Sequence, residues 1–304
     1  MSLPDPLLLA TRYARPVLVA GLAAGIALPG PAQVLSGWIP EMVVILLFLG
    51  ALRLSPTDLR ALGSGLPRAA WFVLVGQLML PMTVLAIAFA LGAAQSPVTL
   101  ALVLLACAPP IVSSPNIAAI MRLDVPTAMQ LMVLGSVLLP VTVLPVFWFM
   151  PALGSAEQIL GATLRLVLTI LLAGGGALLL RRIAFTDTGP QTLQRIDGLS
   201  VLALAIFVIA LMASVSDAIA TAPATFVFWL VIAFAANFGT QIVMLGLGRD
   251  PVSGARAFVA GNRNVSLFFV ALPPELTAPL LVFLGCYQLP MLLTPVLLAR
   301  LYRH

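Results

Sequence analysis

The chain is a succession of long apolar segments separated by short polar loops. Runs of about 20 apolar residues, the length that crosses a bilayer as a helix, predict ten spans. They lie near residues 14–30, 35–54, 69–92, 98–121, 126–150, 158–180, 196–214, 223–247, 251–272 and 277–300. The pattern therefore predicts an all-α polytopic membrane protein with one transmembrane domain, residues 1–304. The first run is expected to be a retained helix and not a secretory signal, because Asp5 precedes it and no clear cleavage site follows.

Two of these spans are interrupted by polar residues that cannot rest against lipid. The fourth contains Ser-Ser-Pro-Asn at 113–116, and the ninth contains Gly-Asn-Arg-Asn at 261–264. A charge at bilayer depth costs about 2.5–3.5 kcal/mol on insertion scales, so an arginine there normally faces a partner or a cavity. Broken segments at corresponding positions in two halves of a chain are typical of a transporter's binding site. We therefore predict that helices 4 and 9 are discontinuous.

A short internal repeat accompanies the two breaks. The pair Pro140 and Pro145 in the fifth span recurs as Pro290 and Pro295 in the tenth, 150 residues later. Five spans per half is an odd number, so the second half must be inverted relative to the first. The sequence predicts two inverted five-helix repeats, at about 10–150 and 156–304.

The composition excludes an ordinary soluble domain. Hydrophobic residues make up 62% of the chain, charged residues 8%, and the mean hydropathy is +1.15. Soluble domains carry roughly 25% charged residues. The net charge of +5 comes from arginines set against ten acids. In loops between apolar spans, such arginines indicate membrane topology, and no nucleic-acid partner is expected.

The arginines fall in alternate loops. All but two of the 15 are on one predicted side, and they are Arg12, Arg15, Arg53, Arg60, Arg68, Arg122, Arg181, Arg182, Arg195, Arg249, Arg256, Arg300 and Arg303. The positive-inside rule then predicts that both termini are cytoplasmic. Of the two exceptions, Arg165 is near a span end, where it can snorkel or pair with Glu157. Arg263 is near mid-span, where snorkelling does not explain it as easily.

Polar residues at and near the breaks are the candidate ligand-binding groups. Unwound helices free backbone groups, and the N-termini of half-helices suit anions whereas unwound carbonyls suit cations. The candidate substrate-binding residues are Gln77, Ser113, Ser114, Asn116, Asn262, Arg263, Asn264 and Gln288. The alternative for each is a structural role, in which serines and asparagines cap the broken helices and amides bind helices together. The same alternative applies to Asn237 and Gln241, one turn apart in the eighth span.

No catalytic or metal-binding pattern occurs in the sequence. The single histidine is His304, and the two cysteines, Cys107 and Cys286, fall in apolar segments as small packing residues. There is no nucleophile elbow and no phosphate-binding glycine loop. We therefore expect neither an enzyme, nor a metal site, nor a cofactor.

Four stretches together resemble the bile acid:sodium symporter superfamily. They are LLFLGALRLSPTDLR at 46–60, GQLMLP at 76–81, APPIVSSPNIAAIMRLD at 108–124 and GNRNVSL at 261–267. The resemblance implies ten helices in inverted repeats, with a panel of helices 1, 2, 6 and 7 moving against a core of helices 3–5 and 8–10. It also implies a divergent, bacterial-type carrier of the inner (plasma) membrane, in which Gln77 matches a sodium ligand.

The sequence departs from the family at the sodium sites. The family's glutamate is Val259 here, and the glutamine that follows the glycine is Arg263. The family's sodium-binding serine and threonine fall on Ala128 and Met132. Gln77 and Ser114 keep suitable chemistry, and Asn116 is a third candidate. A fixed cation a few ångströms away opposes a bound cation, so sodium is not expected at the usual sites.

These observations predict a secondary active transporter of a small organic anion, in which Arg263 replaces sodium chemistry and alternating access moves the substrate. Arg263 offers a carboxylate two parallel hydrogen bonds. One alternative is a sodium-coupled organic anion symporter with a rearranged site. A second is a membrane sensor or scaffold that binds a ligand without transport. The expected partners are the anion and the lipid bilayer, and the pattern does not predict an oligomeric state.

Overall fold

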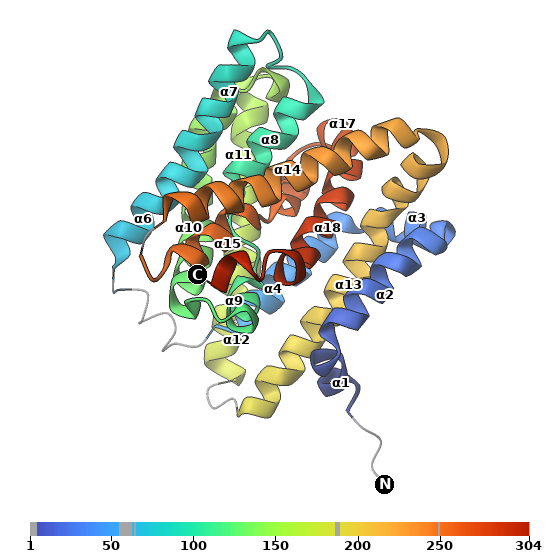
Figure 1. Cartoon of the computed structure of the whole chain (residues 1–304), viewed down its shortest axis with the longest axis vertical. Helices are drawn as coiled ribbons and strands as arrows, with labels where there is room; N and C mark the ends of the chain where they lie inside the picture. Colours follow the sequence, from blue (N-terminus) through green and yellow to red (C-terminus); the bar gives the residue numbers. More distant parts are fainter. Residues whose placement is uncertain (1–4, 55–62, 64, 186–188, 249, 304) are drawn as a thin grey trace. The chain divides into compact units, whose positions relative to one another are not determined.

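The protein is described by a computed structural model that covers residues 5–54, 63, 65–185, 189–248 and 250–303. Every regular element in these residues is a helix (Figure 1). Extended pairing within them is confined to an isolated bridge between Pro110 and Arg263. Two arginines of the predicted loop pattern, Arg60 and Arg249, lie outside the described residues.

Several helices are long and apolar enough to cross a membrane. Within the described residues these are Leu66–Ala90, Val125–Trp148, Ala156–Ala184, Pro190–Thr221, Pro223–Leu247 and Pro274–Leu297. These 6 spans become 8 if each of two bent pairs is one span: α1 (Pro6–Arg12) with α2 (Ala14–Ala27), and α3 (Pro29–Ser36) with α4 (Ile39–Leu52). The chain is thus an all-helical multi-pass membrane protein, as the apolar pattern predicts.

The predicted second span began too early. Residues 35 and 36 belong to α3, and the axis bends by 76° before α4 begins at Ile39. Pro40 is in the first turn of α4, where a missing N–H is no loss because that turn has no internal acceptors for its donors. The predicted fourth and ninth spans are each divided into shorter helices, described below.

Contacts divide the chain into two compact units. The first, Met1–Leu59 with Leu168–Phe226, holds α1 to α4, α12 (Gly176–Ala184) and α13 (Pro190–Thr221). The second is Arg60–Val167 with Val227–His304. The boundary at Leu168 falls inside the helix 156–184, which is the sixth predicted span.

In the first unit, α13 packs against α1, α2, α3 and α4. Glycines permit the close approach of α2 to α13, whose ribbons run alongside each other in Figure 1. A Cβ added to Gly25 would lie 2.6 Å from Met212 Cβ and 2.9 Å from Ile209 Cα. Small residues at such contacts let helices gain van der Waals contact where lipid supplies no hydrophobic driving force.

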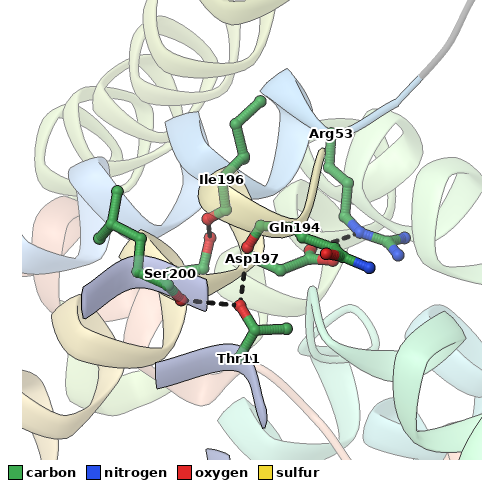
Figure 2. A network of polar contacts seen from close by, with 7 residues as sticks. Thr11, Arg53, Gln194, Ile196, Asp197 and Ser200 are labelled. Atoms are coloured by element: carbon green, nitrogen blue, oxygen red, sulfur yellow. Dashed lines mark hydrogen bonds and ion pairs between the residues drawn. The ribbon is translucent and has the colours of Figure 1, made fainter. Parts of the chain in front are cut away.

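Polar contacts tie the ends of α1 and α4 to α13 (Figure 2). The Thr11 hydroxyl donates to the Gln194 carbonyl at 2.7 Å, and Arg53 Nε pairs with Asp197 Oδ1 at 2.6 Å. The Arg53 side chain is 39% exposed, so the pair contributes little to stability and mainly sets position.

One sequence interpretation in this unit needs correction. Arg181 is not in a loop: it belongs to α12 and is 6% exposed, with Nε and Nη1 lacking hydrogen-bond partners among the described residues. The Arg181 side chain therefore lies among packed helices, and not in a solvent-exposed loop as its charge suggested. The glycines at 174–176 do not permit a close helix contact of the kind seen at Gly25, because a Cβ on any of them would meet nothing within 4 Å among the described residues.

The second unit is organised around α10 (Val125–Trp148), which contacts α6 (Leu66–Leu74), the π-helical turn η1 (Val75–Met79), α8 (Pro97–Cys107), α9 (Ser114–Met121) and α15 (Ser253–Gly261). Its other helices are α7 (Leu80–Ala90), α11 (Ala156–Thr169), α14 (Pro223–Leu247), α16 (Phe268–Ala271), α17 (Pro274–Thr277) and α18 (Leu281–Leu297). Both repeated proline pairs lie inside helices, one in α10 and one in α18.

The glycine contact between α2 and α13 gives a testable prediction. Gly25→Ala would force a Cβ into the backbone of α13, and overpacking of this kind typically costs about 1–3 kcal/mol. The matched control is Gly30→Ala, because a Cβ at Gly30 in α3 meets nothing within 4 Å. Thermal unfolding in detergent should show a lower midpoint for Gly25→Ala alone. Equal midpoints for the two variants would contradict the packing described.

Candidate functional site at the crossing of two interrupted helices

The first interruption covers residues 108–113. Helix α8 ends at Cys107, and Ala108 is extended, with φ −60° and ψ 145°. A residue before proline is driven from helical geometry, and Pro109 and Pro110 follow. The sequence interpretation placed this break at 113–116, which is wrong. Pro115 instead occupies the first turn of α9, where its missing N–H is tolerated.

The second interruption lies at 262–264, within the stretch 261–264 expected from the sequence. Helix α15 ends at Gly261, and a 3₁₀ turn, η4 (Val265–Leu267), starts after Asn264. Asn262 is extended, with φ −108° and ψ 90°. The unwound segment is therefore only three residues long.

The two unwound segments pair with each other through their main chains. The Ile111 N–H donates to the Asn262 carbonyl at 3.0 Å, and the Asn264 N–H donates to the Pro109 carbonyl at 2.7 Å. They form the antiparallel bridge between Pro110 and Arg263. Lipid offers no hydrogen-bond partners, so irregular backbone at membrane depth must be satisfied within the protein. Each break supplies the partners that the other needs.

Arg263 is buried at this crossing. The residue is only 6% exposed. Its Nε donates to the Ala260 carbonyl at 2.8 Å, and its Nη1 donates to the Ala108 carbonyl at 2.9 Å. The ion pairs among the described residues involve other arginines. A guanidinium has five N–H donors, so the Nη1–Nη2 edge retains donors beyond these two bonds. The buried charge has carbonyl dipoles around it but no carboxylate from the described residues.

The position of the guanidinium depends on a glycine in the neighbouring helix. A Cβ on Gly76, in η1, would lie 3.1 Å from Arg263 Nη2. That distance is tighter than ordinary van der Waals contact, so any larger residue would push the guanidinium away. Gly76 thus leaves room for the charge at the crossing.

Tyr287 in α18 braces the unwound backbone. Its hydroxyl donates to the Gly261 carbonyl and accepts from the Arg263 N–H at 3.3 Å. Asn237 Nδ2 in α14 donates to the same Gly261 carbonyl at 2.6 Å. Tyr287 and Asn237 are both fully buried. The last carbonyl of α15 therefore has two side-chain donors in place of a continuing helix.

A buried polar network extends from Asn237 toward the C-terminal residues. Gln241 Nε2 donates to Asn237 Oδ1 at 2.6 Å and to Thr294 Oγ1 at 3.1 Å. The Tyr302 hydroxyl donates to Gln241 Oε1 at 2.7 Å, and burial raises the pKa of Tyr302 above its ordinary value. The network fixes α14 against α15 and α18, the structural role that was one of the two alternatives for Asn237 and Gln241.

Two hollows border Arg263, both within the second unit. The smaller hollow has a volume of about 10 Å³ and is lined by Phe72, Val73, Gln77, Pro110, Leu131, Val259 and Arg263. The larger hollow has a volume of about 170 Å³ and is lined by Leu80, Val84, Leu102, Leu105, Ala106, Ala236, Thr240, Ala260, Gly261, Arg263 and Tyr287. A site of about 10–15 Å³ holds one water, so only the larger hollow has room for an organic ligand.

Arg263 and Gln77 are the predicted site residues that border these hollows. Gln77 is 1% exposed; its Nε2 donates to the Gly135 carbonyl at 3.2 Å and its Oε1 accepts from the Thr142 hydroxyl at 3.4 Å. Gln77 shares the smaller hollow with Val259, whose side chain is apolar. This hollow therefore combines an amide and a guanidinium with apolar walls.

The side chains of the other predicted residues make mainly local contacts, although Asn262 Oδ1 also accepts from Asn237 Nδ2 at 3.4 Å. Ser114 Oγ donates to the Ile111 carbonyl at 2.7 Å, and Ser113 is the N-cap of α9 but makes no side-chain capping bond. Asn262 Nδ2 donates to the Phe258 carbonyl at 2.9 Å, Asn264 Oδ1 accepts from the Ser266 hydroxyl at 2.6 Å, and Gln288 Nε2 donates to the Leu284 carbonyl at 3.5 Å. Asn116 is half-buried in the first half of α9. None of these side chains borders either hollow.

Sequence reasoning missed Tyr287 and Thr240. Both sit in apolar spans, where an aromatic ring or a threonine attracts no notice. The available signal was the hydroxyl itself, since a buried tyrosine normally finds a hydrogen-bond partner.

Comparisons with known proteins add no relatives: no protein-family model matches the chain, and no curated protein matches it in sequence. The geometry of the site therefore carries the functional argument.

Removing the Tyr287 hydroxyl tests the bracing of the break. Tyr287→Phe leaves the Arg263 N–H without its acceptor, and an unsatisfied buried donor costs about 1–3 kcal/mol. Tyr13→Phe is the control, because Tyr13 is 49% exposed. Denaturation in detergent should show a loss of stability for Tyr287→Phe only. A Tyr287→Phe protein as stable as Tyr13→Phe would show that the hydroxyl does not hold the unwound segment.

Proposed function

We propose that the protein is a secondary active transporter of a small organic anion, and that Arg263 supplies the binding charge. The observation that carries the proposal is the burial of Arg263 without a carboxylate among the described residues. An uncompensated charge of this kind is strongly destabilising, and such residues in membrane proteins mark substrate or ion pathways. A bound carboxylate would neutralise the charge and use the remaining guanidinium donors.

The chemistry around Arg263 favours an anion over sodium. The positions of the family's oxygen ligands carry Val259, Ala128 and Met132, whose side chains have no oxygen. Gln77 retains its oxygen but borders the same hollow as the guanidinium. A fixed positive charge a few ångströms from a cation raises its binding free energy by several kcal/mol at an effective dielectric of about 20. We therefore propose that transport of the anion is coupled to protons, occurs in exchange for a second anion, or is uncoupled.

The two interrupted helices support a carrier mechanism. Secondary transporters commonly bind substrate near the membrane midplane, where discontinuous helices of two inverted repeats meet. The main-chain pairing of 109–111 with 262–264 and the proline pairs inside α10 and α18 agree with that plan. We propose that the chain has ten spans in inverted repeats, resembles the bile acid:sodium symporter superfamily, and lies in a bacterial inner membrane with cytoplasmic termini.

The mechanism we propose is alternating access, with the first unit as the panel and the second as the core. Its support is the division of contacts into two units, with both interruptions in the second. In this scheme the anion binds to a core whose internal hydrogen bonds persist, while the two units rearrange. A sensor that binds without transport is the rival, and it differs in producing no flux in proteoliposomes.

Ligand-dependent thermal stability tests the role of Arg263. A ligand that binds only the folded state stabilises it by about 2.7 kcal/mol at a concentration 100 times its Kd. Purified protein should be stabilised by small carboxylates to the same extent in sodium and in potassium. Arg263→Gln should abolish this stabilisation, because an amide supplies no charge. Arg256→Gln, which removes a half-buried arginine of α15 paired with Asp250, is the matched control.

Two results would count against this function. Stabilisation that requires sodium would indicate a rebuilt sodium site and favour the symporter alternative. Carboxylate binding retained by Arg263→Gln would remove Arg263 from the site. Uptake of a labelled carboxylate into proteoliposomes then separates a carrier from a sensor.

A further inference from the structure

The larger hollow has one charged end and otherwise apolar walls. Arg263 is the charged residue that borders it, and Leu102, Leu105 and Ala106 of α8 form one wall. Leu80 and Val84 of α7 face the same space. The arrangement separates a site for a negative group from a site for hydrocarbon.

The two hydroxyls in the wall offer no free hydrogen. Thr240 Oγ1 donates to the Ala236 carbonyl at 2.6 Å, and the Tyr287 hydroxyl donates to the Gly261 carbonyl. A second carboxylate on a ligand would therefore meet neither a positive charge nor a hydrogen-bond donor among these lining residues. A buried ion without a partner is strongly unfavourable, so a dianion should be rejected.

The size of the hollow limits the hydrocarbon. Its volume of about 170 Å³ is below the roughly 300–1,000 Å³ of pockets for drug-sized ligands, and close to a cavity of about 150 Å³ that holds benzene. This space fits a carboxylate with a tail of a few carbons and has no room for a multi-ring acid or for the whole of a long chain.

We infer that the larger hollow selects short-chain aliphatic monocarboxylates, with the carboxylate on Arg263 and the tail against α8. The inference rests on the proposed anion site and adds the substrate class. Each buried methylene contributes about 0.8 kcal/mol, equivalent to about fourfold in affinity. Affinity should therefore rise about fourfold per methylene from acetate until the hollow is full, and fall for longer chains.

The experiment measures the thermal stabilisation of the full-length protein by a series of straight-chain monocarboxylates from acetate to decanoate. Succinate and glutarate are the dicarboxylate comparisons, at matched ionic strength. Leu102→Ala enlarges the hollow, so the chain length of tightest binding should increase by about two to three carbons. Ala106→Leu should shorten it. Leu134→Ala, at a half-buried leucine of α10 that does not border the hollow, is the control and should leave the optimum unchanged.

The outcomes distinguish the substrate class from the function on which it rests. A chain-length optimum that shifts with Leu102→Ala and disappears in Arg263→Gln supports the inference. Dicarboxylates that bind as tightly as monocarboxylates, or an optimum unmoved by Leu102→Ala and Ala106→Leu, would overturn the substrate class but leave an Arg263-dependent anion site standing. If no carboxylate stabilises the wild-type protein, the proposed function fails together with the inference. The Leu102→Ala and Ala106→Leu variants change the hollow in opposite directions, so misfolding of one leaves the other as a test.

Discussion

The structure of the second unit depends on a buried positive charge held at the crossing of two unwound segments. Arg263 donates to a carbonyl on each side of the crossing, Ala260 in its own segment and Ala108 in the other. Carbonyl dipoles reduce the cost of burying the guanidinium, but they do not neutralise it. The fold therefore keeps a charge where a water-filled cavity or an anionic ligand would be favourable, and this is the physical basis of the proposed function.

The surrounding polar groups hold that charge by satisfying the backbone first. The two breaks exchange main-chain hydrogen bonds, and Tyr287 and Asn237 both donate to the Gly261 carbonyl. A network in which every member is paired is rigid, whereas a partly satisfied one is unstable. Most of the buried amides and hydroxyls near the crossing therefore stabilise the fold through their hydrogen bonds. The guanidinium retains spare donors, and the proposed function assigns these to a ligand.

Sequence reasoning located the charge but not all of its setting. Arg263 was conspicuous because an arginine in an apolar span must be explained by a partner or cavity. The first break was misplaced because polar residues at 113–116 were weighed above Pro109 and Pro110, whose steric effect ends α8. The larger hollow could not be predicted from the sequence, because the leucines and alanines of α8 give the same apolar pattern whether they face a cavity, a helix or lipid.

The predicted number of ten membrane spans illustrates a second limit of prediction from the sequence. Hydropathy measures apolar length, but bends of 91° and 76° in the first 52 residues depend on how short helices pack, which composition does not record. The multi-pass helical class followed from the composition, because 62% hydrophobic residues leave no soluble alternative. The contact of residues 109–111 with 262–264 joins segments about 150 residues apart. The two polar interruptions at corresponding positions in the two halves and the proline repeat were the sequence signals for it.

The most direct measurement of the central claim is the uptake of a labelled carboxylate by proteoliposomes that are loaded with the unlabelled carboxylate, in sodium-free potassium buffer. The account predicts a saturable uptake by the wild-type protein that is unchanged when sodium replaces potassium and absent in Arg263→Gln. Uptake that appears only with sodium, or uptake that survives in Arg263→Gln, would contradict the claim that Arg263 supplies the charge for anion binding.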